Sequence, residues 1–283
     1  MKTRSLLREA RRALASSLLI EHYAGQEAIE SEELLAEALG HTESLPSEIS
    51  AADMRRFESL LSKRLEGDPI AVIRGWEGFR GLRVGVRPGV FVPRQSSELL
   101  AERAVRRLRA RKRPIAVDVA TGAGPVALSI ANEVPGATVF GTDIAADAVK
   151  LARANARRLN LRARFIVADG LAGLPPSTRH SVDVITLHPP YVPIDEVSEL
   201  PDEFRWAEPI HTHSDGSDDG MGLVRETASR CSGEWLKIGG WLAVEVSPDA
   251  SRTVAAILRA ANLRGVRITG ARPSFTRVIV GMR

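Results

Sequence analysis

The sequence predicts an α/β protein in which a doubly wound, mostly parallel seven-stranded sheet follows a small helical amino-terminal domain. Two observations carry this prediction. Over the first 65 residues, apolar side chains recur at helical spacing, whereas beyond about residue 98 short apolar segments alternate with helical stretches. A chain of 283 residues also has the size at which a small domain commonly accompanies a large one.

The amino-terminal domain contains two well-marked helices. One is predicted over residues 31–39 and ends at Gly40. The other begins at Ser50, which can form a capping pair with Asp53, and it ends before Gly67. The apolar residues of this second helix recur at helical spacing and are Met54, Phe57, Leu61 and Leu65.

Glycine and proline punctuate the next segment, residues 79–94 ("FRGLRVGVRPGVFVPR"), and predict a small hairpin. We therefore expect three parts: a helical domain over residues 1–75, a hairpin linker over 76–94 and the sheet domain over 95–283.

Seven strands are predicted in the sheet domain, with helices between most of them. They are Ile115–Ala120, Ala137–Thr142, Arg164–Ala168, Val182–Leu187, Trp241–Ser247, Val266–Thr269 and Arg277–Gly281. This alternation predicts helices on both faces of the sheet and ligand binding at the carboxyl ends of the strands.

Composition argues against several classes of protein. The 39 Lys and Arg against 35 Asp and Glu give a net charge of only +4, and Cys231 is the single cysteine, so no internal disulfide can form. Arginines interrupt the leucines of the amino terminus, which is unlike a signal peptide, and no apolar run approaches the 18 residues of a membrane span. We expect a cytoplasmic protein.

Three strand ends carry residues that suit a nucleoside cofactor. Gly122 and Gly124 follow the first sheet strand, where glycine lets a ligand approach the backbone. Asp143 ends the second strand, where an acid can accept hydrogen bonds from both ribose hydroxyls, and Asp169 ends the third. The pattern fits either a dinucleotide or S-adenosylmethionine. Pro125 removes an amide from the helix terminus where a pyrophosphate would bind, which favours the latter.

The fourth predicted strand ends in "LHPPYVP", residues 187–193, and here the chain resembles methyltransferases that carry Asn-Pro-Pro-Tyr or Asp-Pro-Pro-Tyr. Of these, it more closely resembles the HemK or PrmC family of protein-glutamine N5-methyltransferases. Other segments that resemble this family are "GDPIAVIRG", Phe79–Leu82, "FVPRQSSELL", "DVATGAG", "GTD", Glu208–Pro209 and Asp218–Gly220. The similarity covers roughly residues 30–283.

The resemblance implies S-adenosylmethionine as the cofactor and the Gly-Gly-Gln loop of a peptide chain release factor as the protein substrate. It implies cofactor binding by Asp118, Ala120, Thr121, Gly122, Gly124, Asp143, Ile144, Asp169, Gly170 and His188. The catalytic residues would be His188, Pro189 and Tyr191, and the substrate would meet His188, Pro189, Pro190, Tyr191, Glu98 and Arg94. We expect a monomer in which the helical domain recognises the protein substrate.

The chemistry of an amide explains such a loop. An amide nitrogen is a poor nucleophile because its lone pair is delocalised into the carbonyl. Acceptors aimed at its two N–H groups, here the side chain at position 188 and the Pro189 carbonyl, would orient it and favour positive charge developing on the nitrogen. Methyl transfer needs no metal.

His188 departs from the family, which has Asn at this position. A neutral imidazole offers one acceptor nitrogen, whereas a protonated one offers none. Three readings stay open: retained amide methylation, a different acceptor such as a small molecule or another peptide, and a cofactor-binding paralogue without activity. A nicotinamide-dependent oxidoreductase is a further alternative, which rests on the glycine loop alone.

Charge after the motif argues against a nucleic-acid substrate. One arginine, Arg205, stands among nine acids in residues 194–219, and phosphates beside the reacting base would require cations there. The acids are Asp195, Glu196, Glu199, Asp202, Glu203, Glu208, Asp215, Asp218 and Asp219. The basic run over residues 103–113 fits a solvated helix end better than a contact with an acidic partner or ribosomal RNA.

Two patterns resemble metal sites. The acids of residues 215–226 approach the spacing of a calcium loop, but Gly222 stands where that loop needs an aliphatic residue. His211 and His213 alternate in a polar loop, where histidines commonly face solvent. We expect no metal ion.

Overall fold

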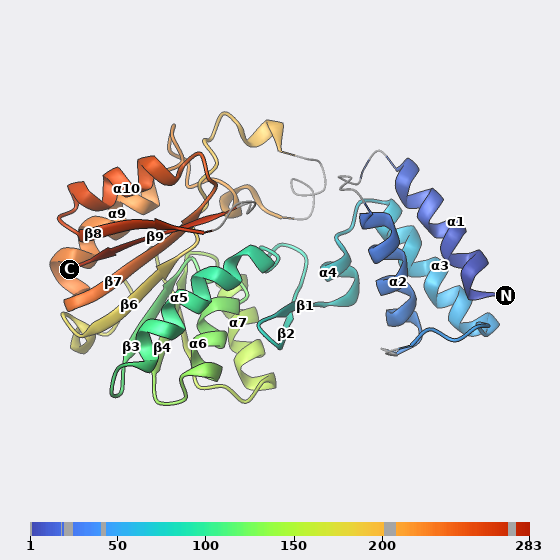
Figure 1. The fold of residues 1–283 in the computed structure, drawn as a ribbon, viewed down its shortest axis with the longest axis horizontal. Helices are drawn as coiled ribbons and strands as arrows, with labels where there is room; N and C mark the ends of the chain where they lie inside the picture. Colours follow the sequence, from blue (N-terminus) through green and yellow to red (C-terminus); the bar gives the residue numbers. More distant parts are fainter. Residues whose placement is uncertain (1, 18, 20–24, 41–43, 201–207, 271–275) are drawn as a thin grey trace. The chain divides into compact units, whose positions relative to one another are not determined.

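The computed structural model describes residues 2–17, 19, 25–40, 44–200, 208–270 and 276–283 (Figure 1). The chain forms two compact units, Met1–Trp76 with Ser198–Glu208, and Glu77–Val197 with Pro209–Arg283. Three of the charged residues counted above, Asp202, Glu203 and Arg205, lie outside the described residues. Within the described part of the chain, no helix combines the length and apolar character needed to cross a bilayer.

The first unit is helical, with α1 (Thr3–Ser16), α2 (Gln26–Ala38), α3 (Ala51–Leu65) and the short α4 (Ile70–Arg74). Ser50 caps α3 as predicted, because its side chain accepts a hydrogen bond from the Asp53 backbone N–H at 3.1 Å. The helix predicted over residues 31–39 begins earlier, at Gln26. The apolar faces of α1, α2 and α3 meet in a core of their own that includes Leu6, Leu34 and Phe57.

A buried ion pair lies within this helical unit. Arg64 is fully buried, and its Nε and Nη2 donate to the two carboxylate oxygens of Glu30 at 2.9 and 2.8 Å. This bidentate geometry joins the end of α3 to the middle of α2.

The predicted hairpin is present as β1 (Trp76–Phe79) and β2 (Leu82–Gly85), somewhat earlier than its predicted span. Its second strand is bound to α7 (Ala146–Arg158), because Gly85 N–H donates to Asn155 Oδ1 at 2.8 Å and Asn155 Nδ2 donates back to the Gly85 carbonyl at 3.0 Å. Apart from Trp76, the hairpin therefore belongs to the second unit.

The second unit is built on a seven-stranded sheet in the order β5-β4-β3-β6-β7-β9-β8 (Figure 1). Its strands are β3 (Ile115–Val119), β4 (Thr138–Asp143), β5 (Arg164–Val167), β6 (Val182–Leu187), β7 (Leu236–Val246), β8 (Arg264–Thr269) and β9 (Arg277–Met282). The pairs from β5 to β7 are parallel, and β9 runs antiparallel to both of its neighbours. The predicted doubly wound, mostly parallel sheet is confirmed.

Helices cover both faces of this sheet (Figure 1), and each face has its own apolar core. One core contains residues of α5 (Glu98–Arg109), α6 (Pro125–Glu133) and α7, and the other contains residues of α9 (Gly222–Arg230) and α10 (Ser251–Ala260). Short helical turns occur at Gln95–Ser97, Pro176–Thr178, Val197–Glu199, Ile210–Thr212 and, as a π-helical turn, Cys231–Trp235.

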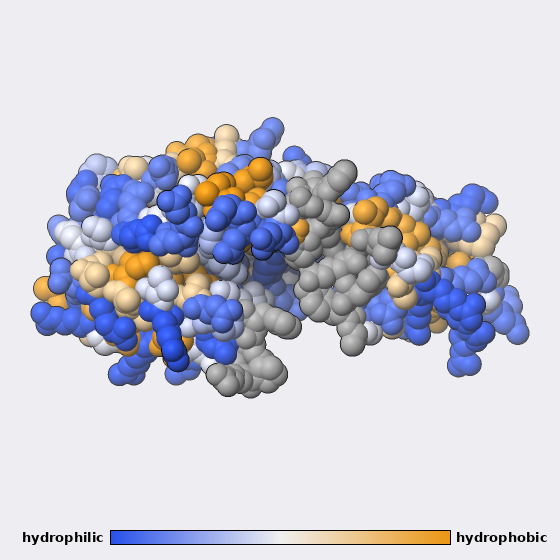
Figure 2. All heavy atoms as spheres, turned by 90° about the horizontal axis from the view of Figure 1, so that it is seen from above, coloured by the Kyte–Doolittle hydropathy of each residue, from blue (hydrophilic) through white to orange (hydrophobic). Residues whose placement is uncertain are grey.

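The surface is mostly polar. Figure 2 shows one face on which hydrophilic residues predominate and hydrophobic ones form separate small patches. The basic run at the end of α5 is partly used within the fold, since Arg107 stacks 4.5 Å from the Trp241 ring and Arg109 pairs with Glu133 at 3.1 Å.

Candidate active site

A cleft opens in the second unit at the carboxyl ends of β3, β4, β5 and β6, where the strand order reverses between β3 and β6. Reversal of this kind leaves a crevice in which ligands of open α/β sheets bind. Nine of the ten residues predicted to bind a cofactor line it: Asp118, Ala120, Thr121, Gly122, Asp143, Ile144, Asp169, Gly170 and His188.

The loop between β3 and α6 is held against the end of β4. Thr121 N–H donates to the Thr142 carbonyl at 2.9 Å, and Gly122 N–H donates to Asp143 Oδ2 at 2.8 Å. Gly122 has a φ of +55°, and a Cβ added there would meet no protein atom within 4 Å, so this glycine leaves the cleft open.

Gly124 does not line the cleft. Its φ is +87°, and an added Cβ would lie 3.1 Å from Phe165 Cζ and 3.3 Å from Ala152 Cβ. The residue therefore permits close packing behind the loop, where Pro125 begins α6 as predicted.

Asp143 ends β4 and suits a ribose. Its Oδ1 accepts a hydrogen bond from Ala145 N–H at 2.9 Å, and its Oδ2 accepts the one from Gly122. A carboxylate has about four acceptor positions, so two are left for a pair of hydroxyls. Burial raises the pKa of Asp143, and the two N–H donors oppose that shift.

Asp118 has a more internal role than the sequence suggests. Its carboxylate is 3% exposed and accepts hydrogen bonds from the hydroxyls of Thr121 at 2.6 Å and Thr186 at 2.7 Å. Burial raises its pKa to about 6, against the two hydroxyl donors. The aspartate thus joins the glycine loop to β6.

The predicted acceptor loop borders the same cleft, which His188, Pro189 and Pro190 line. His188 Nδ1 lies 2.9 Å from Ser97 Oγ, and its ring packs edge-on against Phe91 with centroids 5.6 Å apart. Tyr191 does not line the cleft; its ring stacks on His188 with centroids 6.1 Å apart. Burial lowers the pKa of His188 below 6.5, although Glu245 acts to raise it.

A second segment clasps this acceptor loop. Val192 N–H donates to the His213 carbonyl at 2.8 Å, and Asp215 N–H donates to the Pro190 carbonyl at 3.1 Å. Gly220 approaches the loop so closely that an added Cβ would lie 2.1 Å from the Tyr191 carbonyl oxygen. The "DDG" segment therefore ends in glycine for a steric reason.

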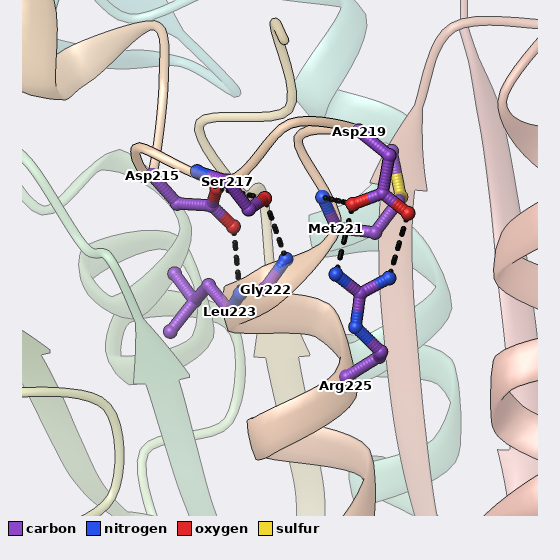
Figure 3. Close-up of polar contacts among 7 residues, drawn as sticks. All are labelled: Asp215, Ser217, Asp219, Met221, Gly222, Leu223 and Arg225. Carbon is purple, nitrogen blue, oxygen red and sulfur yellow. Dashed lines mark hydrogen bonds and ion pairs between the residues drawn. The ribbon is translucent and has the colours of Figure 1, made fainter. Parts of the chain in front are cut away.

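The carboxylates of the calcium-like pattern have protein partners (Figure 3). Asp215 accepts hydrogen bonds from the N–H groups of Ser217 at 2.9 Å and Leu223 at 2.7 Å. Asp219 accepts from Met221 N–H and from both terminal nitrogens of Arg225, at 2.7 and 2.8 Å. These contacts shape the loop and the start of α9. Within the described residues, no three His, Cys, Asp or Glu side chains are grouped so as to hold a metal ion.

Arg94 lines the cleft, as the sequence predicts, with its guanidinium 4.4 Å from the Phe91 ring centroid. Glu98 does not line it. Its carboxylate accepts a hydrogen bond from Arg80 N–H at 2.7 Å and so binds the turn of the hairpin.

Several residues near the site were missed by the sequence analysis. Ser97, Phe91 and His211 line the cleft, and Glu245 lies buried 3.7 Å from His188 Nδ1. Glu245 alone left a signal in the sequence, since it is an acid within the apolar run of a strand predicted to be covered on both faces.

Known proteins resemble both parts of the chain. Residues 6–75 match the model of the PrmC N-terminal domain, and residues 81–200 match that of the methyltransferase small domain. The release factor glutamine methyltransferase of Moorella thermoacetica is 34% identical over 76% of this chain and 75% of its own. The protein of the same name from Bradyrhizobium diazoefficiens is 34% identical over 76% of this chain and 72% of its own.

A solved structure shares the fold. The T. thermophilus 16S rRNA N2 G1207 methyltransferase, in complex with AdoMet and guanosine, superposes with a TM-score of 0.53 at 19% identity, over 74% of this chain and 49% of that one. These comparisons favour a methyltransferase over the nicotinamide oxidoreductase that the glycine loop alone left open. The chain belongs to the release factor glutamine methyltransferase family and is an S-adenosylmethionine-dependent methyltransferase.

Proposed function

We propose that this protein methylates the side-chain amide nitrogen of a glutamine in a peptide chain release factor. The observation that carries this proposal is that His188, Pro189 and Pro190 line the same cleft as Asp143 and Gly122. The names of the relatives support the substrate, and the residues present support the chemistry.

Three positions would face the cofactor, and a fourth would fix the loop behind them. Asp143 would accept hydrogen bonds from the ribose hydroxyls, Asp169 would face the adenine amino group, and the backbone at Gly122 would border the cofactor, with Asp118 fixing the loop from behind. When bound, S-adenosylmethionine supplies an electrophilic methyl group on a sulfonium sulfur.

His188 can replace the family asparagine as an acceptor. Because burial lowers its pKa below 6.5, the imidazole is neutral at pH 7 and has one acceptor nitrogen. Ser97 occupies Nδ1, which leaves Nε2 for the cleft. Nε2 and the Pro189 carbonyl would take the two N–H groups of the amide and orient its nitrogen.

The proposal extends to how the protein substrate is bound. The helical unit would bind the body of the release factor and the cleft would receive its loop, with the protein acting as a monomer. The acidic residues near the acceptor loop, Asp195 and Glu196 among them, favour a protein substrate over a nucleic acid.

Labelled methyl transfer tests the proposal. With radiolabelled S-adenosylmethionine, we expect label on an intact release factor and none on the same factor with its loop glutamine replaced by alanine. Binding of the cofactor without label on either form would contradict the substrate assignment.

One observation favours a second candidate, a different methyl acceptor in the same cleft. An imidazole is a stronger base than an amide, so His188 could also serve an acceptor that must lose a proton before it attacks. If His188→Asn gains release-factor activity that the natural protein lacks, this second candidate replaces the first.

A further inference from the structure

Glu245 is the buried acid nearest the acceptor loop. In the parallel pairing of β6 with β7, Thr186 lies beside Ala243 and Leu187 beside Val244. The next step of the same register brings His188 beside Glu245. The Glu245 side chain is 0% exposed, and its Oε2 lies 3.7 Å from His188 Nδ1.

This carboxylate has no hydrogen-bond partner among the described residues, at either oxygen. A buried and unpartnered carboxylate destabilises a fold, so its presence calls for a compensating group. Two titratable rings feel this carboxylate, those of His188 and Tyr191, and His188 is the one with an atom 3.7 Å from it. Arg94 and Ser97 are also arranged around His188. Arg94 opposes a positive charge on the ring, whereas Glu245 favours one.

We propose that Glu245 is a positioning residue that keeps a proton on His188 Nδ1, so that Nε2 faces the methyl acceptor as a proton-accepting nitrogen. At 3.7 Å the carboxylate acts by its charge rather than by a hydrogen bond. Ser97 Oγ, at 2.9 Å, takes the Nδ1–H hydrogen bond. In the Ser-His-Asp triad a buried acid likewise keeps the proton on Nδ1, although there the acid itself takes the hydrogen bond.

This proposal rests on the proposed function for its substrate. In the transfer step the bond from sulfur to methyl carbon breaks, and its electron pair stays on sulfur. The acceptor nitrogen bonds the methyl carbon with its lone pair, and the N–H proton passes to His188 Nε2. The resulting imidazolium lies beside the negative charge of Glu245 until the proton leaves to water.

Nuclear magnetic resonance of the full-length protein, with histidine labelled by ¹⁵N, tests the proposal without any methyl acceptor. We expect the neutral ring of His188 to carry its proton on Nδ1. In Glu245→Gln the pKa of His188 should fall by about one unit or more, because an opposite charge within about 4–6 Å raises such a pKa by that order. Glu234→Gln is the matched control, since Glu234 lies away from His188, is half-buried and pairs with Arg179 and Arg230. A proton on Nε2, or an unchanged His188 pKa in Glu245→Gln, overturns the proposal.

The pH dependence of methylation gives a second readout. Glu245→Gln should move the acidic limb of kcat/KM to lower pH and reduce kcat on the plateau by roughly 10- to 100-fold, with little change in KM. A purely structural residue would lower activity without moving the limb.

His188→Asn keeps the proposal testable if Glu245→Gln does not fold. It should remove the acidic limb, because Asn does not titrate, and persistence of that limb would overturn the proposal. If release factors prove not to be the substrate, the resonance experiment still decides the role of Glu245, so the two failures can be told apart.

Discussion

At the scale of single residues, Ala120 carries backbone strain in the cofactor loop. Its φ is +53°, in the left-handed region that favours glycine. Ala in this region is disfavoured by about 1–2 kcal/mol, and only part of that is offset by its lower freedom in the unfolded chain. Ala120→Gly should raise the free energy of unfolding by about 0.5–1 kcal/mol in urea titrations.

Ala145 provides the matched control, because it lines the same cleft with a φ of −83°. Ala145→Gly should lower the free energy of unfolding by roughly 0.5–1 kcal/mol, since glycine adds unfolded-state freedom and removes a Cβ that packs against the core. Equal destabilisation by the two changes would show that position 120 is not strained.

The raised pKa of Asp118 predicts that the stability of the protein depends on pH. The unfolded chain releases its Asp118 proton near the usual pKa of 3.8, while the folded protein holds it until about pH 6. Between these values the unfolded state binds fewer protons, so this group lowers stability as pH rises through that window and contributes a constant penalty above it. A gap of about two units corresponds to roughly 3 kcal/mol.

Asp118→Asn removes this ionisation. Relative to the natural protein, its free energy of unfolding should therefore rise between pH 4 and pH 6 by about 2–3 kcal/mol and then level off. Urea titrations at pH 4, 5, 6 and 7 measure this, with the exposed Asp218→Asn as a control that should track the natural protein. If the difference in free energy of unfolding between Asp118→Asn and the natural protein stays constant from pH 4 to pH 6, the pKa of Asp118 is not raised.

Individual site residues differed in how far they could be predicted. Asp143 and Asp169 follow predicted strands, so the sequence alone places them at one edge of the sheet. Glu98 and Glu245 depend on which segments pair in three dimensions, which local spacing does not encode. The role of Gly124 in packing against Phe165 is a similar long-range contact.

At the scale of elements, the loop at residues 213–220 supports the acceptor loop. Gly220→Ala should displace the chain at Tyr191, because the new Cβ would lie 2.1 Å from its carbonyl oxygen. A displacement of about 1 Å in a catalytic loop can lower a rate by roughly 100-fold. We expect a loss of methylation of that order with the affinity for S-adenosylmethionine retained, measured by label transfer and calorimetry.

Gly216→Ala separates this clash from backbone strain. Gly216 lies in the same loop with a φ of +82°, but its added Cβ would meet nothing within 4 Å. It should cost about 1 kcal/mol of stability and leave the methylation rate within a few-fold of the natural protein. Similar activity losses in both variants would exclude a specific contact between Gly220 and the acceptor loop.

Elements were predicted more reliably than their ends. Six of the seven sheet strands begin within two residues of their predicted starts. In the parallel part of the sheet this is because buried strands read as continuous apolar runs, as in β3 and β6. The exception is β7, which begins at Leu236 rather than at Trp241. Between these two residues the register with β6 shifts, and Gly239 takes a φ of +78°. A glycine pair within an apolar run looks like a strand boundary in sequence, but the structure continues the strand through it.

At the scale of the whole molecule, the chain has separate cores in its two units, and the cofactor cleft is lined by the second unit alone. Separate cores permit local unfolding of one unit while the other stays folded. The PrmC N-terminal domain model matches residues 6–75, in the first unit, and the methyltransferase small domain model matches residues 81–200, most of which lie in the second.

The buried pair of Glu30 and Arg64 tests this independence. Glu30→Ala leaves a buried guanidinium without its bidentate partner, which typically costs about 3–5 kcal/mol. Hydrogen exchange should then accelerate in α1, α2 and α3 but not in the sheet, and the affinity for S-adenosylmethionine should stay within about twofold. If the helical unit binds the release factor, methylation of the intact factor should fall.

Glu32→Ala is the control, because it removes an exposed ion pair with Arg11. It should change the free energy of unfolding by no more than about 1 kcal/mol, with correspondingly small changes in hydrogen exchange, cofactor affinity and methylation. Loss of cofactor affinity in Glu30→Ala would show that the two units fold as one.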